Sequence, residues 1–217
     1  MDRKFSAILF DMDGVLVDSM GAYALSWMSA CGQLGIEISE EEVYRREGEK
    51  KEKSARDFIK SVGMMATRAR VRRLIELQAR EFASAPEPRL FPGVREAVSA
   101  FAEAGFLIGV VTGGVRSEFE RLMPPELSDR INVSVCGDEV MRGKPNPEPY
   151  LTAIMKLDVK PAETAVIENA PFGIQSALKT GAYVVAIRSY LSDEDLAGAH
   201  AFVDDIRDLP KLFGLGG

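Results

Sequence analysis

Asp11 and Asp13 follow an apolar segment, residues 7–10, near the start of this 217-residue chain. An uninterrupted apolar run is typical of a strand that is buried on both faces. A carboxylate held at the end of a rigid strand can attack phosphorus and form an aspartyl-phosphate. A second carboxylate two residues later can protonate the leaving oxygen and then deprotonate the attacking water. We therefore expect Asp11 to act as a nucleophile and Asp13 as a general acid and base.

Other polar residues follow later apolar runs or lie in a loop that can reach the same edge of a sheet. They are Thr112 and Gly113 after residues 106–111, Glu168 and Asn169 after residues 164–167, and Lys144 in the loop at 143–148. In open α/β sheets, ligands bind at the carboxyl ends of the strands. The Thr112 hydroxyl, the backbone N–H groups after it and the Lys144 ammonium can donate to phosphate oxygens. Because two anions repel, the attack on phosphate also needs Mg²⁺, which prefers oxygen ligands.

The elements that must position these residues can be predicted from the hydrophobic periodicity. From residue 18 to residue 88 the pattern is helical only, and from residue 89 onward helices and strands alternate. Alternation of this kind indicates βαβ units and a mainly parallel sheet. We expect an α/β fold, with a Rossmann-like parallel-sheet core formed by residues 1–17 and 89–217 and an inserted helical cap formed by residues 18–88.

The predicted elements can be given by residue number. Cap helices are expected at 20–34, around 43–44 with a Ser39–Glu42 capping box, at 55–63 and at 67–82; core helices at 94–104, 115–123, 147–157, 171–180 and 206–213; and core strands at 7–10, 106–111, 131–135, 164–167, 183–187 and 202–203.

The composition limits the class of protein. Apolar residues make up 46% and charged residues 28% of the chain, which is ordinary for a globular protein. A net charge of −6 argues against a nucleic-acid partner, and no apolar run is long enough to span a membrane. The first residues lack the apolar region of a secretory signal, so we expect a cytoplasmic protein. Cys31 and Cys136 are expected to be buried thiols in a reducing compartment.

Four segments of the sequence resemble the motifs of the haloacid dehalogenase superfamily, and specifically its branch with a helical cap after the first motif. The segments are FDMDGVLVDS at 10–19, VVTGG at 110–114, GKPNPEPY at 143–150 and VIENAPFGIQSALKTGA at 166–182. They occur in the order found in that family and cover nearly the whole chain. A lone DxD would be weak support, whereas the four together are specific.

The resemblance implies roles for the matching residues. Asp11 corresponds to the nucleophile and a Mg²⁺ ligand, and Asp13 to the acid/base, with its backbone carbonyl as a further ligand. Thr112, Gly113 and Lys144 correspond to the groups that stabilise phosphate and nucleophile. The fourth motif usually has Glu-Asp, with the second acid binding Mg²⁺. Here Glu168 is followed by Asn169, whose amide oxygen can coordinate a metal but brings no charge. Glu168 and Asn169 are therefore both expected to be Mg²⁺ ligands, with Glu168 carrying more of the charge.

Several residues outside the motifs are weaker candidates. In this family the cap loop that corresponds to residues 49–56 contacts substrate, so Lys50, Lys51 and Lys53 are candidates for holding an anionic group. Asp138 is a candidate for supporting Lys144. His200, the single histidine, lies far from the motifs in the sequence and is not expected to be catalytic.

The favoured function is an Mg²⁺-dependent phosphatase of a small phosphorylated metabolite, such as a sugar phosphate or phosphoglycolate. A first alternative is a phosphosugar mutase similar to β-phosphoglucomutase. Such mutases usually have a histidine on the first cap helix, where this chain has Tyr23 and no histidine. A second alternative is a non-catalytic binding or regulatory protein, which only Asn169 favours. Asp13 argues against dehalogenation, because dehalogenases of the superfamily lack this second aspartate. The sequence contains no readable sign of oligomeric state.

Overall fold

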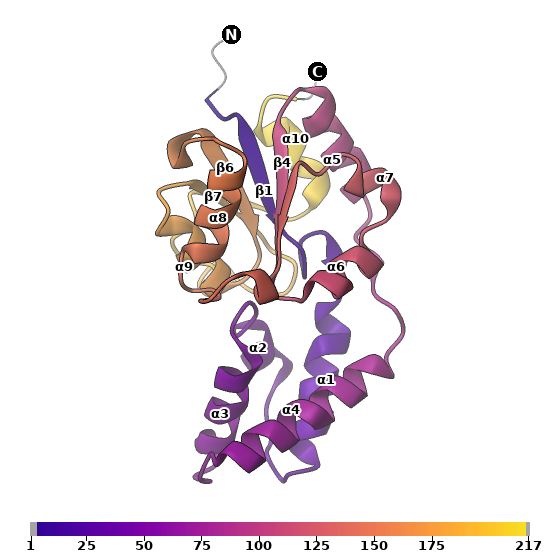
Figure 1. The fold of residues 1–217 in the computed structure, drawn as a ribbon, viewed down its shortest axis with the longest axis vertical. Coiled ribbons are helices and arrows are strands. Elements are labelled where there is room, and N and C mark those ends of the chain that lie inside the picture. Colours follow the sequence, from indigo (N-terminus) through magenta and orange to yellow (C-terminus); the bar gives the residue numbers. More distant parts are fainter. Residues whose placement is uncertain (1–3, 216–217) are drawn as a thin grey trace.

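A computed structural model describes residues 4–215 of the chain. Its core is a parallel sheet of six strands in the order β5-β4-β1-β6-β7-β8 (Figure 1). The strands are β1 (Ala7–Asp11), β4 (Leu107–Val111), β5 (Val133–Val135), β6 (Thr164–Glu168), β7 (Tyr183–Ile187) and β8 (Ala201–Val203). The central strand β1 pairs with β4 on one side and with β6 on the other, and Asp11 lies opposite Val111. The α/β fold and the parallel sheet predicted from the sequence are confirmed.

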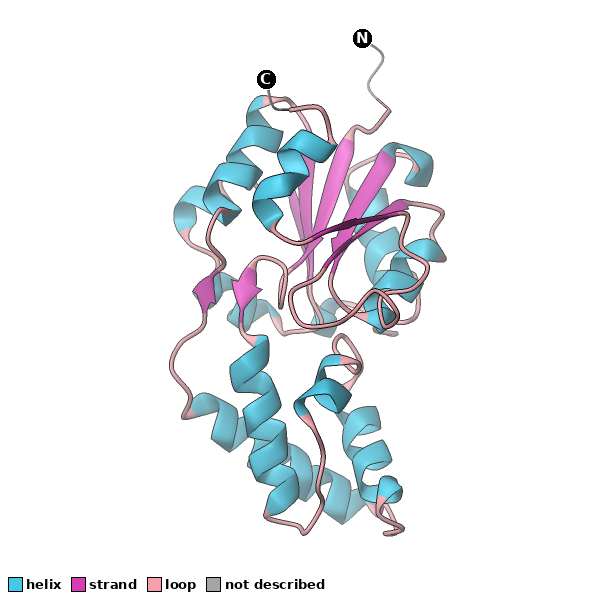
Figure 2. Cartoon of the chain, turned by 180° about the vertical axis from the view of Figure 1, so that it is seen from behind, coloured by secondary structure: helices cyan, strands magenta, loops and turns pink. Residues whose placement is uncertain are grey.

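Helices cover both faces of this sheet (Figure 2). They are α5 (Val94–Glu103), α6 (Arg116–Leu122), α7 (Pro125–Ser128), α8 (Glu148–Lys156), α9 (Pro171–Leu178) and α10 (Leu209–Leu212), with short 3₁₀ turns η1 (Gly137–Glu139), η2 (Pro161–Glu163) and η3 (Ile206–Asp208). Because side chains alternate along a strand, Ile8 and Phe10 of β1 enter the hydrophobic core that contains Phe101 of α5. Leu9 enters the opposite core, which contains Ile174 of α9. The continuous apolar run of β1 therefore results from burial on both faces.

The inserted segment forms a helical cap with a hydrophobic core of its own. Its helices are α1 (Met20–Gly32), α2 (Glu40–Tyr44), α3 (Lys51–Ser61) and α4 (Arg68–Ala83). Trp27 is fully buried there and packs edge-on against Phe58 and Tyr23. Figure 1 shows the cap below the edge of the sheet at which β1 ends. Two short antiparallel strands, β2 (Val17–Asp18) and β3 (Arg89–Leu90), connect cap and core.

Most predicted elements are present, with differences at their ends. The Ser39–Glu42 capping box is formed at the start of α2. The third cap helix begins at Lys51 rather than near Ala55, because the charged run before Ala55 is itself helical. The predicted helix at 206–213 is a 3₁₀ turn followed by α10. β2, β3 and α7 were not predicted, since segments of two to four residues have no measurable periodicity.

The division into residues 1–17 and 89–217 as core and 18–88 as cap stays a prediction, and residues 1–3 and 216–217 lie outside the described residues. β2 and β3 pair at the two predicted boundaries. None of the helices within residues 4–215 combines the length and the apolar character needed to cross a membrane. A cytoplasmic location likewise stays a prediction.

Both cysteines are buried free thiols, and burial raises the pKa of Cys31 to about 12 and that of Cys136 to about 11.

Candidate active site

The predicted site residues meet at the carboxyl edge of the sheet. Asp11 is the last residue of β1, Glu168 is the last residue of β6, and Thr112 directly follows β4. All three side chains are almost completely buried, with exposed fractions of 3%, 1% and 3% for Asp11, Glu168 and Thr112. Lys144, which comes from the loop before α8, is 5% exposed. The parallel topology thus brings together residues that are far apart in the sequence.

The Lys144 ammonium lies between two carboxylates. Its Nζ donates to Asp11 Oδ1 at 2.5 Å and to Glu168 Oε1 at 2.7 Å. Burial alone lowers the pKa of Lys144, but the Asp11 and Glu168 carboxylates more than offset this effect and the net pKa is raised. Burial raises the pKa of Asp11, an effect that Lys144 opposes and Glu168 reinforces. Lys144 is therefore a fixed positive charge that holds Asp11 in place.

Glu168 has all of its hydrogen-bonding positions occupied by the protein. Besides Lys144, its Oε1 accepts from the Tyr150 hydroxyl at 2.6 Å. Its Oε2 accepts from the backbone N–H groups of Asn169 and Ala170. A Cβ on Gly173 of α9 would lie 1.7 Å from Glu168 Oε1, so a glycine is needed there for the carboxylate to fit. In this structure Glu168 anchors Lys144 rather than pointing into open space.

Asp13 is held by two hydroxyl groups. Ser19 Oγ donates to Asp13 Oδ1 at 2.6 Å, and Thr112 Oγ1 donates to Asp13 Oδ2 at 3.1 Å. Thr112 Oγ1 in turn accepts from the Gly114 N–H at 3.0 Å. Burial raises the pKa of Asp13, and the two hydroxyl bonds only partly oppose this shift. A carboxyl group with a raised pKa is suited to donating a proton.

Gly14 permits the backbone to turn directly after Asp13. Its φ of +81° lies in the left-handed region that favours glycine. A Cβ on Gly14 would also lie 2.0 Å from Asn169 Nδ2, so any larger residue would displace the Asn169 side chain. The first and fourth sequence motifs are thus in direct contact at this point.

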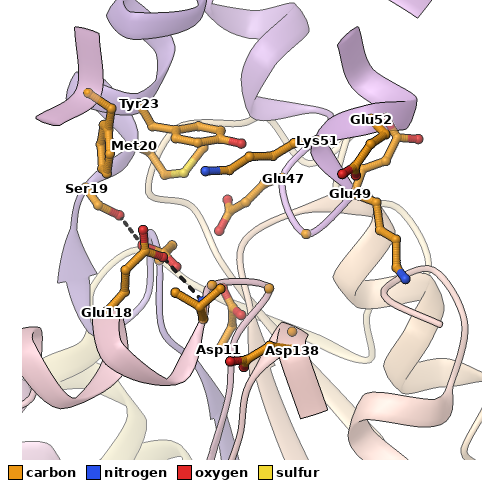
Figure 3. A pocket seen from close by; sticks show the side chains of 18 residues that line it. Asp11, Ser19, Met20, Tyr23, Glu47, Glu49, Lys51, Glu52, Glu118 and Asp138 are labelled. Atoms are coloured by element: carbon orange, nitrogen blue, oxygen red, sulfur yellow. Dashed lines mark hydrogen bonds between the residues drawn. The ribbon is translucent and has the colours of Figure 1, made fainter. Parts of the chain in front are cut away.

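A cavity of about 380 Å³ lies between the cap and the core, with Asp11 and Asp13 among its lining residues. Its size is in the range of small-molecule sites. Figure 3 shows Tyr23, Met20 and Lys51 on the cap side of this cavity and Glu118 and Asp138 on the core side. Gly113, predicted to bind phosphate, also lines the cavity.

The three candidate lysines of the cap loop lie in different surroundings. Lys51 lines the cavity, and its Nζ is 5.9 Å from the centre of the Tyr23 ring. Lys50 also lines the cavity, but its Nζ donates to the backbone oxygen of Met141 in the core at 2.8 Å. Lys53 does not line the cavity and forms ion pairs with Glu49 and Asp57. Of these three lysines, Lys51 is the one whose ammonium has no hydrogen-bond partner within residues 4–215.

The expectation that Asp138 supports Lys144 is wrong. Asp138 lies in η1, and its Oδ1 accepts from the Arg116 N–H at the start of α6 at 3.1 Å. The support of Lys144 comes instead from Glu168, which Tyr150 holds in place. His200 lies at the opposite edge of the sheet, where its Nδ1 accepts from the Val184 N–H near the start of β7.

The sequence analysis missed Glu47, a cap residue that reaches the core. Its side chain is buried, with an exposed fraction of 7%, and Glu47 Oε2 accepts from Asn169 Nδ2 at 2.7 Å. Burial raises the pKa of Glu47 well above its ordinary value, and Asp11 and Glu168 reinforce the shift. The only available sign in the sequence was the neighbouring Gly48, because glycines often mark places where two backbones approach closely. A Cβ on Gly48 would lie 2.8 Å from Lys144 Cδ.

The oxygen atoms around Asp11 are of the type that Mg²⁺ prefers. Asn169 Oδ1 and Glu47 Oε1 are buried and have no hydrogen-bond partner within residues 4–215. The same part of the chain contains no group of three or more His, Cys, Asp or Glu side chains arranged to hold a metal. The residues fit a cation that takes part of its shell from amide oxygen, backbone carbonyl and water, as Mg²⁺ commonly does.

The motifs and the geometry agree with a comparison against protein families. Residues 8–187 match the family described as haloacid dehalogenase-like hydrolase. The chain belongs to this family. Hexitol phosphatase A of Escherichia coli is 31% identical over 192 residues, which cover 86% of this chain and 84% of that protein. The validoxylamine A 7'-phosphate phosphatase of Streptomyces hygroscopicus is 26% identical, over 94% of this chain and 96% of that protein.

A solved structure extends the likeness to the cap. A Bacteroides vulgatus protein, provisionally assigned as a β-phosphoglucomutase, superimposes with a TM-score of 0.87 and 33% identity, covering 98% of this chain and 89% of that chain. The predicted family, the Rossmann-like core with an inserted helical cap and the enzyme class of a haloacid dehalogenase-like phosphatase are confirmed.

Proposed function

We propose that the enzyme hydrolyses the phosphomonoester of a small sugar or sugar alcohol through an aspartyl-phosphate on Asp11, with Mg²⁺ as cofactor. The observation that carries this proposal is the position of Asp11. Its carboxylate is held by Lys144 at 2.5 Å and lines the cavity between cap and core. Asp13, held by Ser19 and Thr112, lines the same cavity.

The mechanism follows from the chemistry of these residues. The Asp11 carboxylate attacks phosphorus, the ester P–O bond breaks, and the Asp13 carboxyl group gives its proton to the leaving alkoxide. Asp13, now a carboxylate, takes a proton from the water that attacks the phosphoenzyme, which releases inorganic phosphate and restores Asp11. Lys144, the Thr112 hydroxyl and the backbone around Gly113 stabilise the phosphoryl oxygens. The closed cap keeps bulk water out of the cavity while Asp11 attacks phosphorus.

Asp11, the Asp13 backbone carbonyl and Asn169 are proposed to hold Mg²⁺, with Glu168 acting beside them by anchoring Lys144. When bound, Mg²⁺ offsets the negative charge of the phosphate and of Asp11.

The cavity is suited to a neutral, hydroxylated leaving group. Its walls combine the apolar surfaces of Met20 and Phe82 with acidic side chains that can accept hydrogen bonds from hydroxyls. The acidic residues beyond Asp11 and Asp13 are Glu47, Glu49, Glu52, Glu118 and Asp138. The two relatives named as phosphatases act, by their names, on the phosphates of a hexitol and of validoxylamine A. This agreement supports a polyhydroxylated substrate.

A phosphosugar mutase is the alternative that the Bacteroides vulgatus likeness favours. A mutase must accommodate a sugar bisphosphate, and its second phosphate requires positive charge in the distal part of the cavity. Here the acidic residues outnumber the two lysines, and Lys51 is the one whose ammonium has no hydrogen-bond partner in the described part of the chain. Tyr23 occupies the part of α1 where the mutases usually have histidine. The charges therefore favour phosphate hydrolysis over the phosphoryl transfer of a mutase. They also argue against a substrate with a second acidic group, such as phosphoglycolate.

The test is phosphate release from a panel with and without Mg²⁺. The panel contains hexitol 6-phosphates, hexose 6-phosphates, phosphoglycolate and p-nitrophenyl phosphate. A separate coupled assay detects conversion of β-glucose 1-phosphate into glucose 6-phosphate by the enzyme. We expect Mg²⁺-dependent hydrolysis of the neutral polyol phosphates and little activity on phosphoglycolate. Isomerisation of the glucose phosphate at a rate above that of its hydrolysis would establish a mutase instead. No turnover of any compound would support a non-catalytic binding protein.

A further inference from the structure

Glu47 and Asn169 form a contact between cap and core that leaves two oxygen atoms without partners. Glu47 Oε2 accepts from Asn169 Nδ2 at 2.7 Å, and this bond fixes the orientation of both side chains. Asn169 Oδ1 and Glu47 Oε1, the remaining oxygens, are buried without a hydrogen-bond partner in the described part of the chain. Asn169 is 2% exposed and Glu47 7% exposed, so bulk water does not satisfy them. Buried acceptors without partners are rare in folded proteins, and a bound ion or water is a common explanation for them.

The charges around this contact are unbalanced. The carboxylates of Asp11, Glu168 and Glu47 are all buried, and of these three Lys144 donates to Asp11 and Glu168. Among the described side chains, no cation forms an ion pair with Glu47. A buried carboxylate without a counter-charge is costly, so it either takes up a proton or has a cation bound next to it. A divalent cation bound beside Asp11 would compensate the charge of Glu47, which lines the same cavity, and would give the unpartnered oxygens a candidate partner.

We propose that Glu47 supplies the cap's own carboxylate to the divalent cation site, and that the site is complete only when the cap is closed. The inference rests on the proposed Mg²⁺-dependent function and deepens it. The amide at residue 169 gives the cation an oxygen but no charge, and Glu47 adds the charge from the opposite domain. Because Glu47 reaches Asn169 only across the interface, Mg²⁺ binding and cap closure favour each other by linkage.

The competing explanation is that the Glu47–Asn169 hydrogen bond is only a latch, that is, a contact that holds cap and core together without binding a cation. Glu47→Gln distinguishes the two explanations. A glutamine can still accept from Asn169 Nδ2, so the latch is kept while the charge is lost. Glu52→Gln is the matched control, because Glu52 lines the same cavity on an exposed part of α3 and forms no hydrogen bond to Asn169. The folding of each variant is checked by circular dichroism and thermal unfolding.

The experiment is a calorimetric titration of the full chain with Mg²⁺ alone, together with hydrogen exchange of residues 45–50 with and without Mg²⁺. We expect Glu47→Gln to weaken Mg²⁺ binding by at least about tenfold and Glu52→Gln to change it by less than about twofold. Mg²⁺ should slow exchange of residues 45–50 in the wild type and in Glu52→Gln, but not in Glu47→Gln. In Asn169→Asp, which places a carboxylate on the core side, Mg²⁺ should bind more tightly and depend less on Glu47.

Two results would overturn the inference in distinguishable ways. If Mg²⁺ binds to the wild type and equally to Glu47→Gln, Glu47 is only a latch and the proposed function is untouched. If Mg²⁺ does not bind to the wild type at all, the Mg²⁺-dependent function fails along with the inference.

Discussion

At the scale of single residues, the site depends on one ammonium group shared by two buried carboxylates. Removing one partner of a buried ion pair is strongly destabilising, because the other charge is left uncompensated. Lys144 therefore serves both stability and chemistry, as it holds Asp11 in position and is itself held by Glu168. The Tyr150 hydroxyl completes this chain of contacts from α8 to Asp11.

The raised pKa of Asp11 predicts a pH dependence of metal binding. Burial raises this pKa from 3.8 to about 7 in the metal-free protein, while Lys144 opposes the shift. Below that pH Asp11 carries a proton, which must leave before the carboxylate can bind a cation. We expect the Mg²⁺ affinity measured by calorimetry to fall below pH 7 by up to about tenfold per pH unit for each carboxyl group that must lose its proton. An affinity that does not change between pH 5.5 and 8 would contradict this prediction.

Which site residues could be predicted depended on where their partners lie in the fold. Asp11 and Glu168 end apolar strands and Thr112 directly follows one, and parallel strands bring such positions to one edge. Tyr150 and Glu47 follow no strand. Their roles depend on the packing of α8 against the sheet and on the angle between cap and core, and neither is encoded in local periodicity. The roles proposed for the motif residues remain predictions until they are tested.

At the scale of elements, α8 is tied to β6 by the hydrogen bond from Tyr150 to Glu168. The Tyr150 side chain is fully buried, and its acceptor is a charged group. Tyr150→Phe removes the donor with little change of shape, so we expect a loss of about 1.5–3 kcal/mol in the free energy of unfolding. Urea denaturation measures this loss. Tyr44→Phe, which removes an exposed bond to Glu40, is the matched control and should cost less than about 0.5 kcal/mol. Equal effects of the two substitutions would disprove the importance of the buried bond.

Within the cap, α1 and α4 pack around a buried glutamine. Gln78 is completely buried, and its Nε2 donates to Ser26 Oγ, whereas its Oε1 has no partner within residues 4–215. Gln78→Met removes the unpaired acceptor and keeps the volume, and Ser26 still donates to the Tyr23 carbonyl. We expect the unfolding free energy to stay the same or to rise by up to about 1 kcal/mol. A loss of more than about 2 kcal/mol would mean that the Gln78 acceptor is satisfied in solution.

The fold itself was more predictable than its connections. The order of the strands and helices along the chain was predicted correctly from the long apolar runs and the amphipathic segments. The short strands β2 and β3 were missed because their pairing depends on the meeting of the two segments that connect cap and core. The order of the strands within the sheet also could not be read from local pattern, since it follows from the packing of the connecting helices.

At the scale of the whole molecule, a few partly exposed contacts hold the cap against the core in addition to the buried Glu47–Asn169 hydrogen bond. Arg45 pairs with Asp195 at 2.6 Å, Lys50 donates to the Met141 carbonyl, and the Tyr44 and Tyr190 rings stack at 4.9 Å. A small set of partly exposed contacts is suited to an interface that must open for substrate exchange. The two linker segments at β2 and β3 are the natural places for such a movement.

Removing one of these contacts should favour the open cap. The Arg45–Asp195 pair is partly exposed, with side-chain exposed fractions of 46% and 14%, so its contribution is at most about 1 kcal/mol. We expect Arg45→Ala to speed hydrogen exchange of residues 45–50 by up to about fivefold. Arg72→Ala, which breaks an exposed pair within α4, is the control and should leave that exchange unchanged. Exchange as slow as in the wild type would show that Arg45 does not hold the cap.

The central claim is that Asp11 forms a phosphoenzyme in an Mg²⁺-dependent phosphatase. The most direct test compares phosphate release by the wild type and by Asp11→Asn, with and without Mg²⁺, on the best substrate of the panel. Asp129→Asn, a substitution at an exposed aspartate after α7, serves as the matched control. We expect release only with Mg²⁺, a loss of roughly 10⁴-fold or more in Asp11→Asn, and no change in Asp129→Asn. Wild-type rates in a folded Asp11→Asn enzyme would contradict the account.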